Sequence, residues 1–222
     1  MSWNHPRPVF APLLLLNSLI SSFMPASAKA SETEPNACST DPIYVGSLGV
    51  AIDLPSCAGH IRQLDAAIRK ATFTASTCLT FHNPTLAYRF LAHLAKNTPE
   101  ILCLNPAEFA KKGRELSAQS DDESGRAGQG HSAQSGGQHV CALGDVGGNR
   151  IYLHPLAFNP SACGPLASVL FHEFLHNISV MVPSTHSPQD HQDGIYGCQE
   201  TCFSSYRSPG RARRVTACEA AH

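Results

Sequence analysis

The chain has almost no net charge, and this lack excludes several classes of partner. Its 222 residues include 16 lysines and arginines against 17 aspartates and glutamates, so the formal net charge is -1. Such a balance provides no electrostatic footprint for nucleic acid or for an anionic membrane surface. The basic run RARR at 211–214 is too short to change this, and we expect it to be a solvated tail. We therefore expect neither nucleic-acid nor membrane partners.

Long apolar runs are also lacking after the first thirty residues, so nothing later in the chain is expected to span a membrane. The start itself has Arg7, the apolar run VFAPLLLLNSLISSFM and the small-residue stretch ASAKA. This order is typical of a secretory signal peptide that is cleaved after Ala28 or Ala30. Pro12 and Asn17 interrupt the run and argue against a membrane anchor. The sequence predicts a signal peptide at 1–30 and a secreted or periplasmic domain at 31–222.

Cysteine, by contrast, is plentiful. All nine cysteines follow the signal segment, and an exported chain meets an oxidising compartment in which thiols pair. We expect four disulfides and one leftover thiol. The sequence does not determine the pairing, but cysteines that follow one another in the sequence, such as Cys38 with Cys57 and Cys78 with Cys103, are candidate pairs. A zinc site built on Cys198 and Cys202 is the weaker alternative, because no second pair of cysteines has matching spacing.

The pattern of apolar residues predicts a mixed α+β domain. Helical spacing extends over HIRQLDAAIRKA at 60–71, and Asn83 and Pro84 mark the start of a second helix at 83–97. HVCAL at 139–143 and NRIYLHP at 149–155 are predicted strands joined by the turn GDVGGN. Between these halves, residues 117–138 are polar and glycine-rich, so we expect a flexible insert within one domain.

The stretch FHEFLHN, Phe171 to Asn177, contains the sequence H-E-x-x-H in a predicted helix. A helix turns once every 3.6 residues, so His172 and His176 lie on the same side and can share one metal ion. Glu173 is adjacent to them and can act as the general base on a metal-bound water. The pattern therefore predicts a hydrolytic zinc centre.

A hydrolytic zinc ion takes three protein ligands and keeps one position for water. One further ligand is thus required, and the next residues provide four candidates: His186, Asp190, His191 and Asp193. The longer signature H-E-x-x-H-x-x-G-x-x-H is absent, because position 179 is serine and position 182 is valine. A metzincin is therefore not expected.

The segment IYLHPLAFNPSACGPLASVLFHEFLHN, followed by DGIYG, resembles the aspzincins, the deuterolysin and peptidyl-Lys metalloendopeptidase group. The resemblance covers about residues 151–197 and implies a zincin-like fold. It implies that His172, His176 and Asp193 bind Zn2+, that Glu173 is the base and that Tyr196 stabilises the oxyanion. The family's Gly-Thr pair is replaced here by Asp190 and His191, and either His186 or His191 can substitute for Asp193 as a ligand.

The sequence thus predicts a zincin-like α+β domain, stapled by disulfides, that acts as a secreted, monomeric zinc endopeptidase on a protein or peptide substrate. By the same resemblance, the strand RIYLHP is expected to expose an edge to an extended substrate, with a plain structural strand as the alternative. Two other functions compete with the peptidase. One is a catalytically inactive zincin-like binding protein, and the other is a disulfide-stapled secreted protein without metal.

Overall fold

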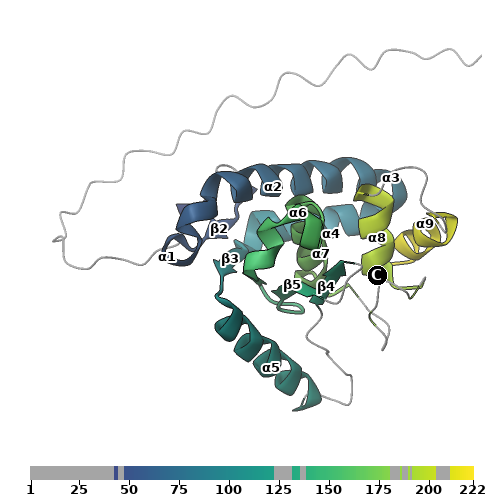
Figure 1. The fold of residues 1–222 in the computed structure, drawn as a ribbon. Coiled ribbons are helices and arrows are strands. Elements are labelled where there is room, and N and C mark those ends of the chain that lie inside the picture. Colours follow the sequence, from purple (N-terminus) through teal and green to yellow (C-terminus); the bar gives the residue numbers. More distant parts are fainter. Residues whose placement is uncertain are drawn as a thin grey trace, which may run out of the picture. The chain divides into compact units, whose positions relative to one another are not determined.

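The structure is a computed structural model that describes residues 43–44, 48–122, 132–135, 139–180, 186, 190, 192–203 and 211–222. All of these residues belong to one unit, 39–222. The unit combines helices with a small mixed sheet (Figure 1), as the predicted α+β class requires. The predicted signal peptide lies outside the described residues. In the part of the chain that is described, no helix is both long enough and apolar enough to cross a membrane.

The longer helices include both helices expected from apolar periodicity. Asn83 caps the second of them, since its side chain accepts a hydrogen bond from the backbone N–H of Leu86, and Pro84 occupies the first position. The longer helices are α2 (Ile61–Thr74), α4 (Pro84–Asn97), α5 (Pro106–Asp122), α7 (Leu166–Asn177), α8 (Gly194–Phe203) and α9 (Arg211–Glu219). Short helical segments are α1 (Leu54–Cys57), η2 (Ala58–His60), η3 (Ala75–Leu79), α3 (Thr80–His82), η4 (Pro155–Phe158) and α6 (Pro160–Cys163).

The sheet has the strand order β1-β2-β3-β6-β5-β4. Strand β3 pairs with β2 and β6 in parallel, and the other pairs are antiparallel. The predicted hairpin is present as β5 and β6. The strands are β1 (Ile43–Tyr44), β2 (Ala51–Ile52), β3 (Glu100–Cys103), β4 (Ser132–Ser135), β5 (His139–Gly144) and β6 (Arg150–Leu153).

This order corrects the expected position of the strand RIYLHP. Its residues form β6, which lies between β3 and β5 and has hydrogen-bonded neighbours on both sides. An interior strand has no free N–H and C=O groups to offer a substrate, so the expectation of an exposed edge was wrong. Among the described strands, β4 and β1 are at the edges.

The range predicted as an insert, 117–138, is partly regular. Helix α5 continues through Asp122, and Ser132–Ser135 form β4, which pairs with β5. Residues 123–131 and 136–138 lie outside the described residues. Flexibility of the range therefore stays a prediction, and the strand assignment adds β4 to the sheet.

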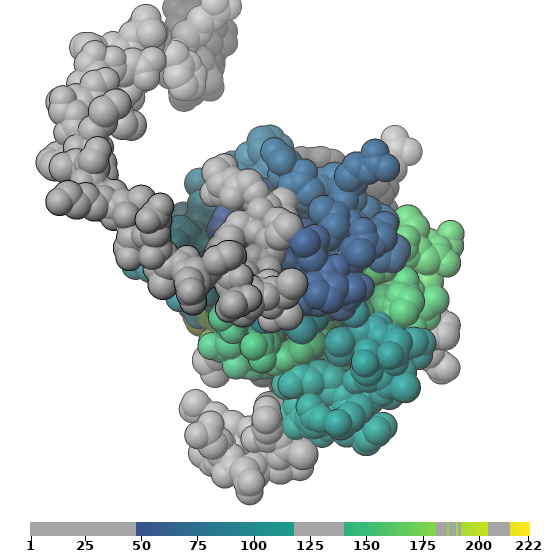
Figure 2. Space-filling view, turned by 90° about the vertical axis from the view of Figure 1, so that its left-hand side faces the viewer, coloured from purple at the N-terminus to yellow at the C-terminus, as the bar shows by residue number. Residues whose placement is uncertain are grey.

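The two faces of the sheet carry different helices. Leu153 and Ile151 belong to the main core with α2, α4 and α7, whereas Tyr152 and Leu143 pack with Phe109 of α5. This alternation follows from the two-residue period of a strand. Figure 1 shows α5 apart from the other helices, and Figure 2 shows its teal surface beside the green residues. Helix α7, which carries H-E-x-x-H, is therefore buried between α2 and the sheet.

Four disulfides are present, as the number of cysteines predicted, and one of them, Cys141–Cys163, joins neighbours in order as expected. The two pairs named as candidates, however, were wrong. Cys57 pairs with Cys103 and not with Cys38, and Cys78 pairs with Cys202 and not with Cys103. The remaining pairs are Cys141–Cys163 and Cys198–Cys218. Since Cys198 and Cys202 are both oxidised, the thiolate zinc site is excluded. Cys38 lies outside the described residues.

The C-terminal RARR is not a solvated tail, at least at its last residue. Arg214 lies in α9 and is only 3% exposed. Its guanidinium forms an ion pair with Glu200 at 3.2 Å and donates a hydrogen bond to the Asp190 carbonyl at 2.6 Å. Charge counting missed this contact because the acceptors come from a part of the chain that only folding brings near.

Candidate metal centre

Helix α7 places two histidines and a glutamate in the protein interior. All twelve of its residues are buried, and His172, Glu173 and His176 have no exposed surface. Burying an ionisable side chain is costly unless a partner compensates it. His172 has two such neighbours from the chain that follows α7, Gln199 and His186.

His186 completes a cluster with the two helix histidines. The ligand atoms of His172, His176 and His186 all lie within 4.8 Å of one another, and this group can hold a metal ion. The Nε2 of His172 is 3.2 Å from that of His176 and 3.3 Å from that of His186. Two imidazole nitrogens bound to tetrahedral zinc at about 2.0–2.1 Å lie about 3.3–3.4 Å apart. The two separations measured from His172 thus match those of imidazole ligands that share one metal ion.

The outer nitrogens of two of these rings face oxygen acceptors. His172 Nδ1 lies 2.9 Å from Gln199 Oε1, and His186 Nδ1 lies 2.5 Å from Asp193 Oδ2. An acceptor at Nδ1 requires the proton there, so Nε2 carries the lone pair. Two such lone pairs then face each other at 3.3 Å. A shared cation at this point satisfies both, which is the arrangement found around metal-binding histidines.

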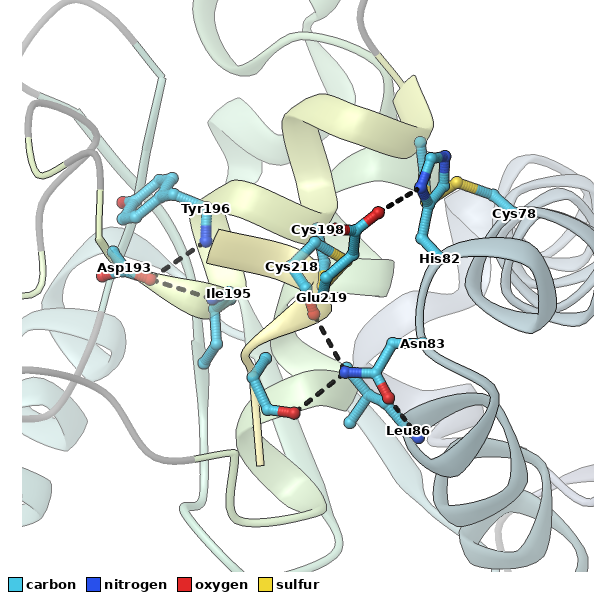
Figure 3. The surroundings of a disulfide bond; sticks show 12 residues. Cys78, His82, Asn83, Leu86, Asp193, Ile195, Tyr196, Cys198, Cys218 and Glu219 are labelled. Atoms are coloured by element: carbon cyan, nitrogen blue, oxygen red, sulfur yellow. Dashed lines mark hydrogen bonds and ion pairs between the residues drawn. A yellow bond between two sulfur atoms is a disulfide. The ribbon is translucent and has the colours of Figure 1, made fainter. Parts of the chain in front are cut away.

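Asp193, the ligand implied by the family resemblance, does not belong to the three-histidine group. Its Oδ2 contacts His186, and its Oδ1 accepts hydrogen bonds from the backbone N–H groups of Ile195 and Tyr196 at 2.9 and 3.0 Å. Figure 3 shows these two bonds at the start of α8. With both oxygens engaged in this way, Asp193 orients His186 and caps the helix. The geometry therefore favours His186 as the third ligand.

The Asp193 carboxylate is held ionised in spite of its burial. Burial raises the pKa of this group, but the hydrogen bond and electrostatic attraction of His186 lower it. The backbone hydrogen bond from Tyr196 and the nearby His172 lower it further, so that the pKa of Asp193 lies below its ordinary value. A buried negative charge thus lies directly behind His186.

Glu173 lies against the end of β5. A Cβ atom built on Gly144 would be 3.0 Å from the Glu173 Oε2 and carbonyl oxygen, and 3.2 Å from the His176 Cβ. A side chain at position 144 would therefore require Glu173 or His176 to shift. Glycine there lets the strand pass close to α7 at the level of the predicted base.

Tyr196 lies beside the cluster, on the first turn of α8. Its ring centroid is 4.6 Å from that of His172 and 4.7 Å from that of His186. Tyr196 therefore contacts the same two rings that Gln199 and Asp193 orient. The position predicted from the Tyr-Gly pair is thus next to the histidines.

The structure brings together His172, Glu173, His176, Tyr196 and Asp193, and it adds His186 to the group that can hold a metal ion. Of the other two candidates, Asp190 lies outside the three-histidine group, and its Oδ1 accepts from the Gln192 N–H. His191 lies outside the described residues. Sequence reasoning missed Gln199 altogether, because nothing in the local pattern distinguishes it from any glutamine on a helix.

The chain was compared with models of known protein families, with curated proteins and with solved structures, and none of the three comparisons finds a match.

Proposed function

We propose that this protein is a secreted zinc-dependent endopeptidase whose metal ligands are His172, His176 and His186. One observation carries the proposal. The three histidines converge at zinc-ligand spacing beside Glu173, the glutamate of H-E-x-x-H. A set of three histidines is typical of zinc sites that keep an open position. In this proposal Asp193 supports His186 and is not itself a ligand.

Zinc bound at this point supplies a Lewis acid, which lowers the pKa of bound water to about 7 and polarises a carbonyl. Glu173, adjacent to both helix histidines, takes the proton of the attacking water and passes it to the leaving amine. The Tyr196 hydroxyl donates a hydrogen bond to the substrate carbonyl oxygen as negative charge develops on it. Glu173 thereby transfers the proton, and Tyr196 stabilises the negative charge on the carbonyl oxygen.

A polypeptide substrate is consistent with the free edge of the sheet. In the described part of the sheet, β4 pairs only with β5, and it also contacts α7. An extended peptide can add to such an edge through main-chain hydrogen bonds. Export is supported by the four disulfides, which persist in an oxidising compartment.

The test is to remove the base and the oxyanion donor separately. Glu173→Gln should retain one equivalent of zinc and lose about 10²–10⁴-fold in peptide hydrolysis, because proton transfer is lost. Tyr196→Phe should retain zinc and lose about 10²-fold or more, the effect of removing one oxyanion donor. Zinc content by mass spectrometry and cleavage of a mixed peptide library are the measurements. A wild-type protein that binds no zinc would refute the proposal.

A second function, a zinc-bearing binding protein without turnover, is favoured by the depth of the site. His172, Glu173, His176 and Asp193 expose no surface at all, and His186 exposes only 1% of its side chain. A substrate reaches such a centre only if the surrounding structure opens. Wild-type protein that binds zinc and cleaves no peptide in the library would support this second function.

A further inference from the structure

Gln199 connects two residues of α7 that lie one turn apart. Its Oε1 is 2.9 Å from His172 Nδ1, and its Nε2 is 2.9 Å from Ser168 Oγ and 3.3 Å from the Ser168 carbonyl oxygen. Residues four apart in a helix lie on the same side. One glutamine from α8 therefore contacts both Ser168 and His172.

The Ser168 carbonyl determines which way the Gln199 amide is oriented. A carbonyl oxygen only accepts hydrogen bonds, so the amide nitrogen must face Ser168 and the amide oxygen must face His172. The amide oxygen is also only an acceptor. His172 must consequently carry its proton on Nδ1, with the Nε2 lone pair directed toward His176 and His186.

We infer that Gln199 is a positioning residue for the metal centre, which acts by holding His172 in the Nδ1–H tautomer. This inference rests on the metal site in the proposed function. A neutral imidazole can carry its proton on either nitrogen, and only the lone-pair nitrogen binds a metal. Asp193 has the same relation to His186, so two of the three rings are oriented by acceptors that belong to α8 or directly precede it.

Replacing Gln199 by leucine and by glutamate separates its role in positioning His172 from its role in packing. Gln199→Leu keeps an apolar stem but removes the acceptor, and it should weaken zinc binding about 10–100-fold, the usual cost of losing such a partner. Gln199→Glu keeps an acceptor for Nδ1–H and should bind zinc more tightly than the leucine variant. Gln63→Leu, an exposed glutamine on α2, is the matched control and should bind as the wild type does.

The measurements are zinc affinity by competition with a chromophoric chelator and the tautomer of His172 by 15N NMR of the metal-free protein. The wild type should show His172 as Nδ1–H, and Gln199→Leu should lose that signature. An Nε2–H tautomer in the wild type would overturn the inference even if the leucine variant did not fold. Equal zinc affinity of Gln199→Leu and wild type, or equal losses in the leucine and glutamate variants, would overturn it as well.

Failure of this inference differs from failure of the proposed function. If wild-type protein binds zinc and cleaves peptides while Gln199→Leu binds zinc equally well, only the positioning role is wrong. If wild-type protein does not bind zinc, the proposed centre itself is wrong.

Discussion

At the scale of single residues, the candidate metal centre is a set of side chains whose hydrogen bonds restrict one another. His186 and Asp193 show this most directly, because the carboxylate that the family resemblance assigns to the metal is bound to the imidazole instead. The local sequence is the same whether Asp193 binds the metal itself or binds His186. The distinction between ligand and supporting residue can therefore be tested only by removing each in turn.

The third ligand is the first prediction at this scale. His186→Ala should release zinc as completely as His172→Ala does, because a ligand is gone. Asp193→Asn should retain zinc with about 10–100-fold lower affinity, since it loses only the charge behind His186. Chelator competition on the purified variants measures both. If Asp193→Asn lost zinc entirely while His186→Ala retained it, Asp193 would be the ligand.

The second residue-scale prediction concerns His93 on α4, which is buried and is not part of the three-histidine group. Its Nδ1 accepts a hydrogen bond from Asn97 Nδ2 at 2.8 Å, and burial lowers the pKa of His93 below its ordinary value of 6.5. The unfolded chain therefore binds this proton more readily than the folded protein does. The contribution of His93 to stability is complete above pH 6.5 and is lost as the pH falls toward the folded pKa.

Denaturant unfolding in the presence of a chelator, at about pH 7.5 and about pH 5.5, tests this sign. The free energy of unfolding should fall between the two conditions, and it should fall less in His93→Gln, which has no proton to gain. The pH dependence that remains in His93→Gln comes from the other titratable groups, including the other histidines. Identical pH dependence in the two proteins would show that His93 is not responsible.

At the scale of elements, α8 packs against α9 through glycines. A Cβ atom on Gly197 would lie 2.8 Å from the Ala217 Cβ, 2.9 Å from the Arg214 carbonyl oxygen and 3.0 Å from the Cys218 nitrogen. The Cys198–Cys218 disulfide joins the same two helices (Figure 3). This close contact holds the helix that provides Tyr196 and Gln199.

Gly197→Ala is the prediction at this scale. Alanine favours a helix by about 1 kcal/mol over glycine, but overpacking against backbone atoms costs about 1–3 kcal/mol. We expect a net loss, seen as a Tm lower by about 2–4 °C for each kcal/mol. Gly59→Ala is the control, because a Cβ there has no neighbour within 4 Å, and its Tm should not fall. An unchanged Tm for Gly197→Ala would mean that α9 shifts at no cost.

At the scale of the whole molecule, one disulfide connects the N-terminal helices with the C-terminal ones. Cys78–Cys202 joins η3 to the end of α8 across a sequence separation of 124, whereas Cys198–Cys218 spans only 20. A crosslink restricts the unfolded chain more when the loop it closes is longer. The contribution of each bond should therefore follow its separation.

Replacing both cysteines of a pair by alanine tests this order. The Cys78/Cys202 double variant should lose about 5 kcal/mol of unfolding free energy, and the Cys198/Cys218 variant about 3 kcal/mol, by the loop-entropy relation. Denaturant unfolding provides the values. Alkylation of the unreduced wild type should label no cysteine of the four pairs. A larger loss from the shorter loop would indicate that native packing, and not chain entropy, dominates.

Much of the fold and part of the site can be predicted from local sequence. Apolar periodicity identifies α2 and α4, and the Asn83-Pro84 pair marks where α4 begins, because capping depends on neighbouring residues alone. The paired positions of His172 and His176 likewise follow from the helix period. Nine cysteines after a predicted signal peptide predict four disulfides for the same kind of reason, since redox chemistry does not depend on the fold.

Only the tertiary structure decided the features that join distant segments. Strand β6 became an interior strand because β3, nearly fifty residues earlier, pairs with it in parallel. The disulfide partners, the burial of Arg214 and the contact of Gln199 with His172 also depend on segments that no local pattern relates. The choice between His186 and Asp193 is of this kind, because it depends on which atoms face each other after α7 and α8 have packed together.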